Sequence, residues 1–137
     1  AGKIVLDYGC GSGILAIAAA LLGARAVWAV DVDPQALSST RENALRNHVA
    51  AQVHPCSPDD LPDLKFDLLT ANILSGPLIK LASRFAELVR PSGTVVLSGI
   101  LESQAGEVMR AYSGWVELRR PQQHEGWIVL NGQRLED

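Results

Sequence analysis

The sequence has few cysteines, no strong excess of one charge and no long apolar run. Cys10 and Cys56 are its two cysteines, too few for the disulfide framework of a small secreted domain, so we expect reduced thiols in a cytoplasmic protein. The net charge of −3 argues against a broad basic surface for nucleic acid. The longest apolar helical segment is too short to cross a bilayer, and we expect neither a signal peptide nor a membrane partner.

Histidine is also scarce, and its distribution excludes two kinds of active site. His48, His54 and His124 are far apart in the sequence and lack the spacing of metal ligands, so we predict no metal site. No Ser-His-Asp set can be placed either, which argues against a serine hydrolase.

The 137 residues, 47% of them hydrophobic, suffice for one domain with a real core. The first three residues lead directly into a buried-type strand with no helix before it. We therefore expect residues 1–137 to be one catalytic domain of a longer protein.

The stretch Val5–Gly13 organises the chain. An apolar segment meets Asp7, and glycine then takes every second position up to Gly13, directly before a helix-compatible apolar segment. Glycines permit a sharp strand-to-helix turn whose free amides can bind a polar or anionic group, although such a turn also occurs without a ligand. Because Ile14 stands where a dinucleotide fingerprint has its third glycine, the pattern fits an NAD site less well. It resembles motif I of S-adenosylmethionine-dependent methyltransferases with a Rossmann-like fold.

Apolar strand-type segments alternate with helix-type segments along most of the chain. Five such β-α units predict an α/β fold, with a mainly parallel twisted sheet and helices on both faces. Only five residues separate the last two strand-type segments, so these should form an antiparallel hairpin, followed by a polar, frayed end from Asn131. Strands are expected at Ile4–Asp7, Ala26–Val30, Ala51–Pro55, Phe66–Ala71, Thr94–Ser98, Trp115–Arg120 and Gly126–Leu130, helices at Ile14–Leu22, Pro34–Asn47, Pro77–Val89 and Glu102–Tyr112, a loop at Ser57–Lys65 and a turn at Pro91–Gly93.

Asp31 follows the second predicted strand and is a candidate ligand for a ribose. A carboxylate there can accept hydrogen bonds from both ribose hydroxyls, a device that NAD enzymes and methyltransferases share. The alternative is a surface acid that caps the next helix, but Asp33, directly before Pro34, fits that role better. We expect this helix to bury Ala36, Leu37, Thr40, Ala44 and Leu45.

Asn72 ends the fourth predicted strand, and Ile73 follows it. This segment resembles the Asn-Pro-Pro-Tyr type motif of enzymes that methylate amino or amide nitrogen. The Asn72 amide oxygen and the next main-chain carbonyl can accept both hydrogens of an amine and so aim its lone pair. The alternative is that Asn72 caps the helix near Pro77.

The loop after the third predicted strand is placed to meet an adenine edge. Ser57, Asp59 or Asp60 could accept a hydrogen bond from the exocyclic amine, and the sequence does not choose among them. The tryptophans at positions 28, 115 and 127 are expected to be core or rim aromatics.

Four segments together resemble the bacterial ribosomal protein L11 methyltransferases, the PrmA family. They are Asp7–Gly13 (DYGCGSG), Asp31–Gln35 (DVDPQ), Ala71–Leu78 (ANILSGPL) and Leu97–Leu101 (LSGIL), and the resemblance covers essentially the whole chain. It implies a class I fold that uses S-adenosylmethionine, releases S-adenosylhomocysteine, and methylates amino groups of a large-subunit ribosomal protein. The family's N-terminal recognition domain and a threonine upstream of the first strand have no counterpart here.

The predicted site combines the motif residues with the resemblance. Other amine methyltransferases, an NAD-dependent oxidoreductase and a non-catalytic cofactor-binding module remain alternatives. We assign Asn72 and Ile73 to catalysis, and Asp7, Gly9, Cys10, Gly11, Gly13, Asp31, Val32, Ser57 and Asn72 to cofactor binding.

Overall fold

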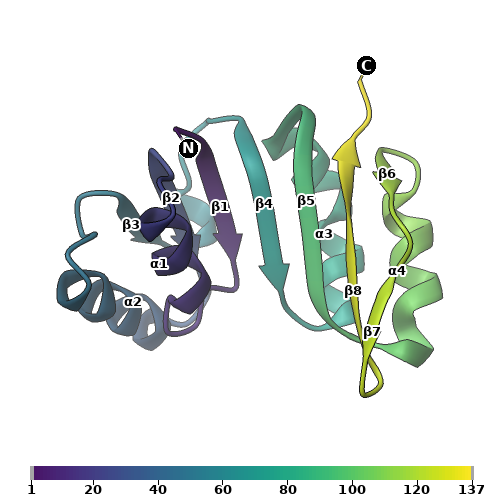
Figure 1. Ribbon diagram of the computed structural model, residues 1–137, viewed down its shortest axis with the longest axis horizontal. Helices are drawn as coiled ribbons and strands as arrows, with labels where there is room; N and C mark the ends of the chain where they lie inside the picture. The colour runs from purple at the N-terminus through teal and green to yellow at the C-terminus, as the bar shows by residue number, and fades with distance from the viewer. Residues whose placement is uncertain (1, 137) are drawn as a thin grey trace. The chain divides into compact units, whose positions relative to one another are not determined.

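The computed structural model describes residues 2–136, which form two compact units (Figure 1). The first unit extends through Phe66, and the second begins at Asp67. Each unit is described in turn.

The first unit is a parallel sheet with strand order β3-β2-β1. Strand β1 is buried along its middle because its apolar residues do not alternate with polar ones. Helices α1 and α2 connect the strands, as parallel neighbours require. The elements are β1 (Ile4–Tyr8), α1 (Ile14–Leu21), β2 (Ala26–Val30), α2 (Pro34–Arg46), β3 (Val53–Cys56) and a 3₁₀ turn, η1 (Pro58–Asp60), inside the predicted loop.

Both helices of this unit have the ends that local sequence predicted. The Asp33 carboxylate accepts a hydrogen bond from the Gln35 amide at 2.9 Å, and Pro34 is the first residue of α2. Gly23 follows α1 with φ 104°, a value that favours glycine. The helix boundaries therefore follow from residues within one turn of each end.

The outer surface of α1 is exposed although the sequence of the helix is apolar throughout. The helix buries Ala16, Ile17 and Ala20, but the side chain of Ile14 is 73% exposed and that of Leu21 60%. Leu45 on α2, expected inside, is also exposed, whereas Thr40 and Ala44 are buried as predicted. The prediction failed because apolar character alone does not show which face finds a neighbour. Within residues 2–136, no helix is both long enough and apolar enough to span a membrane.

The second unit joins β4 and β5 to three antiparallel strands, in the order β4-β5-β8-β6, and β7 also pairs with β8. Helices α3 and α4 lie together behind these strands in Figure 1, and the Tyr112 hydroxyl on α4 donates a 2.7 Å hydrogen bond to the Leu78 carbonyl on α3. The elements are β4 (Phe66–Asn72), α3 (Ser75–Leu88), β5 (Val89–Leu101), η2 (Glu102–Gln104), α4 (Ala105–Tyr112), β6 (Val116–Leu118), β7 (Gln122–His124) and β8 (Trp127–Arg134).

The predicted C-terminal hairpin is confirmed, but it is larger than expected. Strands β6 and β8 pair antiparallel, with Val116 opposite Arg134. The five-residue connection expected between the two hairpin strands contains β7, which pairs with the start of β8. Strand β8 continues to Arg134, so residues 131–134 are paired rather than frayed. Similarly, β5 extends through the predicted Pro91–Gly93 turn, where Ser92 has φ 67°.

Candidate cofactor and acceptor sites

In the first unit, the turn from β1 into α1 has the predicted form. Gly9, Gly11 and Gly13 all have positive φ, at 83°, 56° and 89°. The amides of Gly9 and Cys10 both donate to the Val30 carbonyl, at 2.7 and 3.0 Å, so the turn is anchored on the end of β2. This arrangement leaves the first-turn amides of α1 without intrahelical acceptors, as at any helix start.

The ends of the three parallel strands bring the predicted residues of this unit to one edge. Tyr8 pairs with Val30, and Val30 pairs with Cys56. Gly9, Asp31 and Ser57 are the next residues of the three strands, and the Asp31 amide donates to the Cys56 carbonyl at 3.3 Å. The structure therefore brings the glycine turn, Asp31 and Ser57 together.

The Asp31 carboxylate accepts hydrogen bonds from the nearby backbone and can still accept further hydrogen bonds from a ligand. One carboxylate oxygen accepts a hydrogen bond from the Gly11 amide and the other from the Asp33 amide, both at 3.0 Å. A carboxylate offers about four lone-pair positions, so each oxygen can accept one further donor. Asp31 is only half-buried and does not cap α2, which leaves it available for two hydroxyl groups.

The adenine-side candidates are the loop after β3 and Val32. The Ser57 hydroxyl donates to the Asp60 carboxylate at 3.1 Å, and Asp59 and Asp60 are exposed. Val32 is 80% exposed, so it offers an apolar surface next to Asp31 in the chain.

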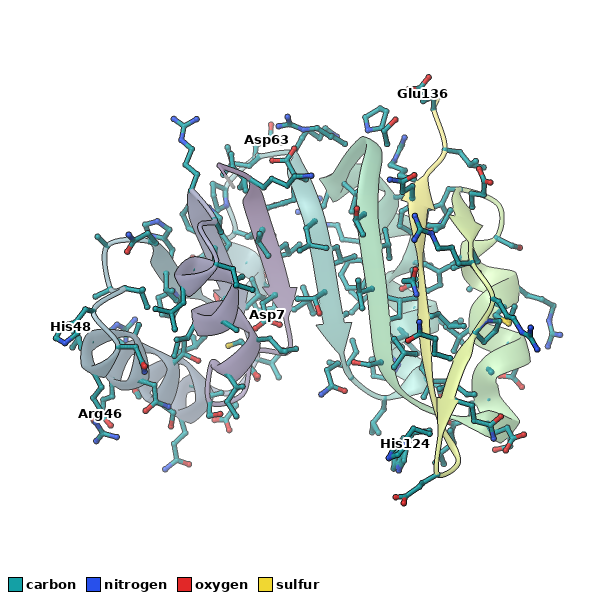
Figure 2. The ribbon with its side chains drawn as sticks, in the orientation of Figure 1. Asp7, Arg46, His48, Asp63, His124 and Glu136 are labelled. Carbon is teal, nitrogen blue, oxygen red and sulfur yellow. The ribbon has the colours of Figure 1, made fainter. Side chains whose placement is uncertain are left out.

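Asp7 differs sharply from Asp31. The residue is 1% exposed, and among the described residues the Ala16 backbone amide interacts with its carboxylate without the geometry of a regular hydrogen bond. Burial raises the pKa of Asp7 to about 6; the Ala16 backbone amide lowers this pKa, and the charge of Asp31 raises it. Figure 2 shows Asp7 inside the fold, whereas Arg46 and His48 project outward beyond α2. A buried carboxylate that interacts with one backbone amide keeps acceptor capacity for a cation or a further N–H donor.

The Cys10 thiol faces inward. It is 8% exposed, and its sulfur lies 3.4 Å from the Thr40 hydroxyl. Burial raises the pKa of Cys10 to about 11, so the thiol is neutral near pH 7 and is no nucleophile. Its contribution to a ligand site is through the backbone of the turn.

Two residues of α2 that received no role from the sequence contact this turn. The Thr40 hydroxyl donates to the Gly11 carbonyl at 3.0 Å, and the Asn43 amide donates to the Ser12 carbonyl at 2.9 Å. Helical periodicity placed Thr40 on the buried face, but it could not show what the hydroxyl meets there.

In the second unit, Asn72 is exposed at the end of β4 and does not cap the following helix. The residue before α3 is Leu74, and no side chain caps this helix. Gly99 on β5 has φ 79°, and a Cβ placed on it would lie 2.7 Å from the Asn72 side-chain oxygen and 3.1 Å from the Ile73 carbonyl oxygen. The two acceptors named from the sequence therefore converge beside Gly99, where the β5–β8 register shifts between Leu97 and Ile100.

An open pocket of about 380 Å³ within the second unit exposes Asn72 beside Gly99. Asn72, Ser98, Gly99 and Trp127 line it, together with Ile128 and Val129. Trp127 is 50% exposed, so it is a rim aromatic rather than a core one. Gly99 and Trp127 were missed as site residues because Gly99 meets Asn72 only where β5 lies beside β4, and Trp127 reaches the pocket only through the β5–β8 pairing.

Known structures define the class of this fold. An RNA methyltransferase from Salinibacter ruber, solved in complex with S-adenosyl-L-homocysteine, superposes with a TM-score of 0.78 at 23% identity, over 98% of this chain and 82% of that one. The protein has the Rossmann-like fold of class I methyltransferases: a mostly parallel mixed sheet with helices and a C-terminal antiparallel hairpin, as the sequence predicted.

Sequence comparison then identifies the family. The profile described as "Ribosomal protein L11 methyltransferase (PrmA)" matches residues 1–135. A "Ribosomal protein L11 methyltransferase" of Marinobacter nauticus is 56% identical over 135 residues, which are 98% of this chain and 45% of that protein. A ribosomal protein L11 methylase from Lactobacillus delbrueckii subsp. bulgaricus superposes with a TM-score of 0.92 at 32% identity, over 99% of this chain and 72% of that one. The chain belongs to the PrmA family, and it spans about half the length of the curated relatives it matches.

Proposed function

We propose that this chain is the catalytic domain of an S-adenosylmethionine-dependent methyltransferase that methylates amino groups of ribosomal protein L11 in the cytoplasm. The names of its relatives support the substrate, and the ligand of the Salinibacter ruber structure supports the cofactor. Since the chain spans about half of those relatives, we assign recognition of the ribosomal protein to the remainder of the longer protein.

The first unit offers groups that fit each part of the cofactor. Asp31 retains acceptor capacity for the two ribose hydroxyls, and Asp7 offers a buried carboxylate with remaining acceptor capacity to a cation. The backbone amides between this turn and the start of α1 that meet no acceptor among the described residues suit the carboxylate of the amino-acid end. We assign the adenine edge to Ser57, with the exposed side chain of Val32 against the ring.

The second unit offers groups that fit an amine, and this is the observation that carries the proposal. The Asn72 side-chain oxygen and the Ile73 carbonyl oxygen lie 2.7 and 3.1 Å from one point beside Gly99, and we infer that they accept both hydrogens of one amine and fix the direction of its lone pair. When bound, S-adenosylmethionine supplies a methyl group on a sulfonium sulfur, which a neutral amine takes by direct displacement. The main role of Asn72 and Ile73 is to position the amine, and positioning can lower the activation barrier by several kcal/mol.

Calorimetric titration of this chain with S-adenosylhomocysteine and, separately, with NADH tests the cofactor assignment. We expect S-adenosylhomocysteine to bind and NADH to fail. Asp31→Asn should weaken S-adenosylhomocysteine roughly 10- to 100-fold, the scale of a hydrogen bond to a charged group. Asp33→Asn makes the same chemical change two residues away and still supplies a good helix cap, so its affinity should match the unsubstituted chain. Binding of NADH alone would refute the proposal.

A methylation assay on the full-length protein tests the amine assignment. Asn72→Ala should lower turnover by about 100-fold, because the amine loses one of its two acceptors and its orientation. Asn47→Ala, at an exposed position on the end of α2, serves as the matched control. Unchanged turnover in Asn72→Ala would remove this residue from the chemistry.

A further inference from the structure

The glycine turn is held from one side by helix α2. Among the described residues, Thr40 and Asp7 are the two fully buried polar ones, and Thr40 is 0% exposed. Its hydroxyl lies 3.0 Å from the Gly11 carbonyl oxygen and 3.4 Å from the Cys10 sulfur. A hydroxyl has one proton to donate, and the carbonyl is the stronger acceptor.

This contact differs from what a buried helical threonine usually does. Such a side chain commonly returns its hydroxyl to a carbonyl one turn earlier in its own helix. Thr40 instead donates to a residue 29 positions away in the sequence. The position of Gly13 reinforces the contact, because a Cβ there would lie 2.9 Å from Thr40 Oγ1 and Cγ2. Thr40 therefore contacts the turn at two places and shapes its path.

The hydrogen bond also sets the direction of the next amide. In a trans peptide the carbonyl and the following N–H point in opposite directions, and the described chain has no cis peptide bond. With the Gly11 carbonyl directed at Thr40, the Ser12 N–H is directed away from α2. Ser12 is exposed, and its amide meets no acceptor among residues 2–136. The neighbouring amides of Gly11 and Gly13 are already bonded, to Asp31 and to the Cys10 carbonyl.

We propose that Thr40 is a positioning residue that aims the Ser12 amide at the carboxylate of the cofactor's amino-acid end. The inference rests on the proposed function, since it needs S-adenosylmethionine as the ligand. Thr40 does not itself touch the ligand. It holds the Gly11–Ser12 peptide in the one orientation that presents a free N–H outward.

Three variants and two ligands test the proposal by calorimetry on this chain. Thr40→Val keeps the shape and removes the donor, Thr40→Ser keeps the donor, and Thr94→Val makes the same isosteric change on β5. The ligands are S-adenosylhomocysteine and 5′-methylthioadenosine, which lacks the amino-acid end. We expect Thr40→Val to bind S-adenosylhomocysteine about 10-fold more weakly, the scale of one lost hydrogen bond with a partner left unsatisfied, and to bind 5′-methylthioadenosine within twofold of the unsubstituted chain. Thr40→Ser should restore most of the loss, and Thr94→Val should show none.

The possible outcomes distinguish failure of the Thr40 inference from failure of the proposed function on which it rests. Equal affinity of Thr40→Val and the unsubstituted chain for S-adenosylhomocysteine overturns the inference and leaves the proposed function standing. An equal loss for both ligands also overturns it, because the change then acts on the whole pocket. Failure of the unsubstituted chain to bind either ligand overturns the proposed function and the inference together.

A second measurement does not depend on the folding of Thr40→Val. In the amide NMR spectrum of the unsubstituted chain, S-adenosylhomocysteine should shift the Ser12 signal strongly, and 5′-methylthioadenosine should shift it little. A Ser12 signal that responds equally to both ligands would contradict the proposed role.

Discussion

The glycine turn of the first unit and the Asn72 segment of the second are held by different means. The turn donates hydrogen bonds to the Val30 carbonyl and the Asp31 carboxylate, and it accepts hydrogen bonds from the side chains of Thr40 and Asn43. No side chain caps helix α3 after the Asn72 segment. The Asn72 and Ile73 acceptors have room only because Gly99 has no side chain. Hydrogen bonds hold the glycine turn, whereas the absence of a side chain at Gly99 leaves room for the two acceptors. We therefore expect the two regions to respond to different substitutions.

The largest expected effect concerns the buried charge beneath the turn. Asp7→Asn should raise the free energy of unfolding of the unliganded chain by about 3 kcal/mol at pH 7, the equivalent of a pKa raised from 3.8 to about 6. Over this range the folded chain holds a proton that the unfolded chain has released. The contribution of Asp7 to stability therefore falls as pH rises from about 4 to 6.

Urea unfolding at pH 4 and at pH 7 checks this expectation. The advantage of Asp7→Asn should be nearly absent at pH 4 and full at pH 7. An advantage that is the same at both pH values would show that the carboxylate charge is not its cause.

The next effect concerns the space that the absence of a side chain at Gly99 leaves beside Asn72 and Ile73. Gly99→Ala should lower turnover of the full-length protein by about 100-fold, the scale expected when a reacting group is displaced by about 1 Å. A Cβ would press on both acceptors, and φ of 79° is unfavourable for alanine. Affinity for S-adenosylhomocysteine should stay within twofold, and Gly106→Ala, whose Cβ would meet only the end of Arg110 at 3.6 Å, should retain activity. A parallel loss of cofactor affinity would mean that the two regions are not separable.

The smallest effect compares two glycines of the turn. Both Gly11 and Gly13 have positive φ, so alanine should cost roughly 1–2 kcal/mol of strain at either position. At Gly13 the new Cβ would also overlap Thr40, whereas at Gly11 it meets nothing within 4 Å. We expect Gly13→Ala to bind S-adenosylhomocysteine several-fold more weakly than Gly11→Ala by calorimetry. Equal affinities would show that the contact with Thr40 adds nothing to the strain.

Features set by neighbouring residues could be predicted from the sequence. Asp33 and Pro34 start α2 because the cap needs only the next two residues, and the strand ends placed Asp31 and Asn72 at candidate site positions. The two acceptors of the proposed amine site, Asn72 and Ile73, are adjacent in the chain, so the sequence alone was enough to propose them as a pair.

Features set by distant contacts could not be predicted. The hydroxyl of Thr40 meets Gly11, and Gly99 meets Asn72, only after the chain has folded. Strand β8 extends beyond its last apolar residue because Gly132 lets it approach the Glu117 carbonyl of β6. A Cβ at this position would overlap that oxygen. Residues 131–134 lack the alternation of apolar and polar residues from which a strand is predicted, so the sequence did not indicate this pairing.

Cys10 gives the glycine turn a built-in chemical reporter. A neutral, buried thiol with a pKa of about 11 reacts slowly with alkylating reagents, which require an exposed thiolate. Its labelling rate at neutral pH therefore measures how often the turn opens. Any ligand that closes the turn should slow the alkylation of this one sulfur, so the occupancy of the region can be followed by mass spectrometry without altering a single residue.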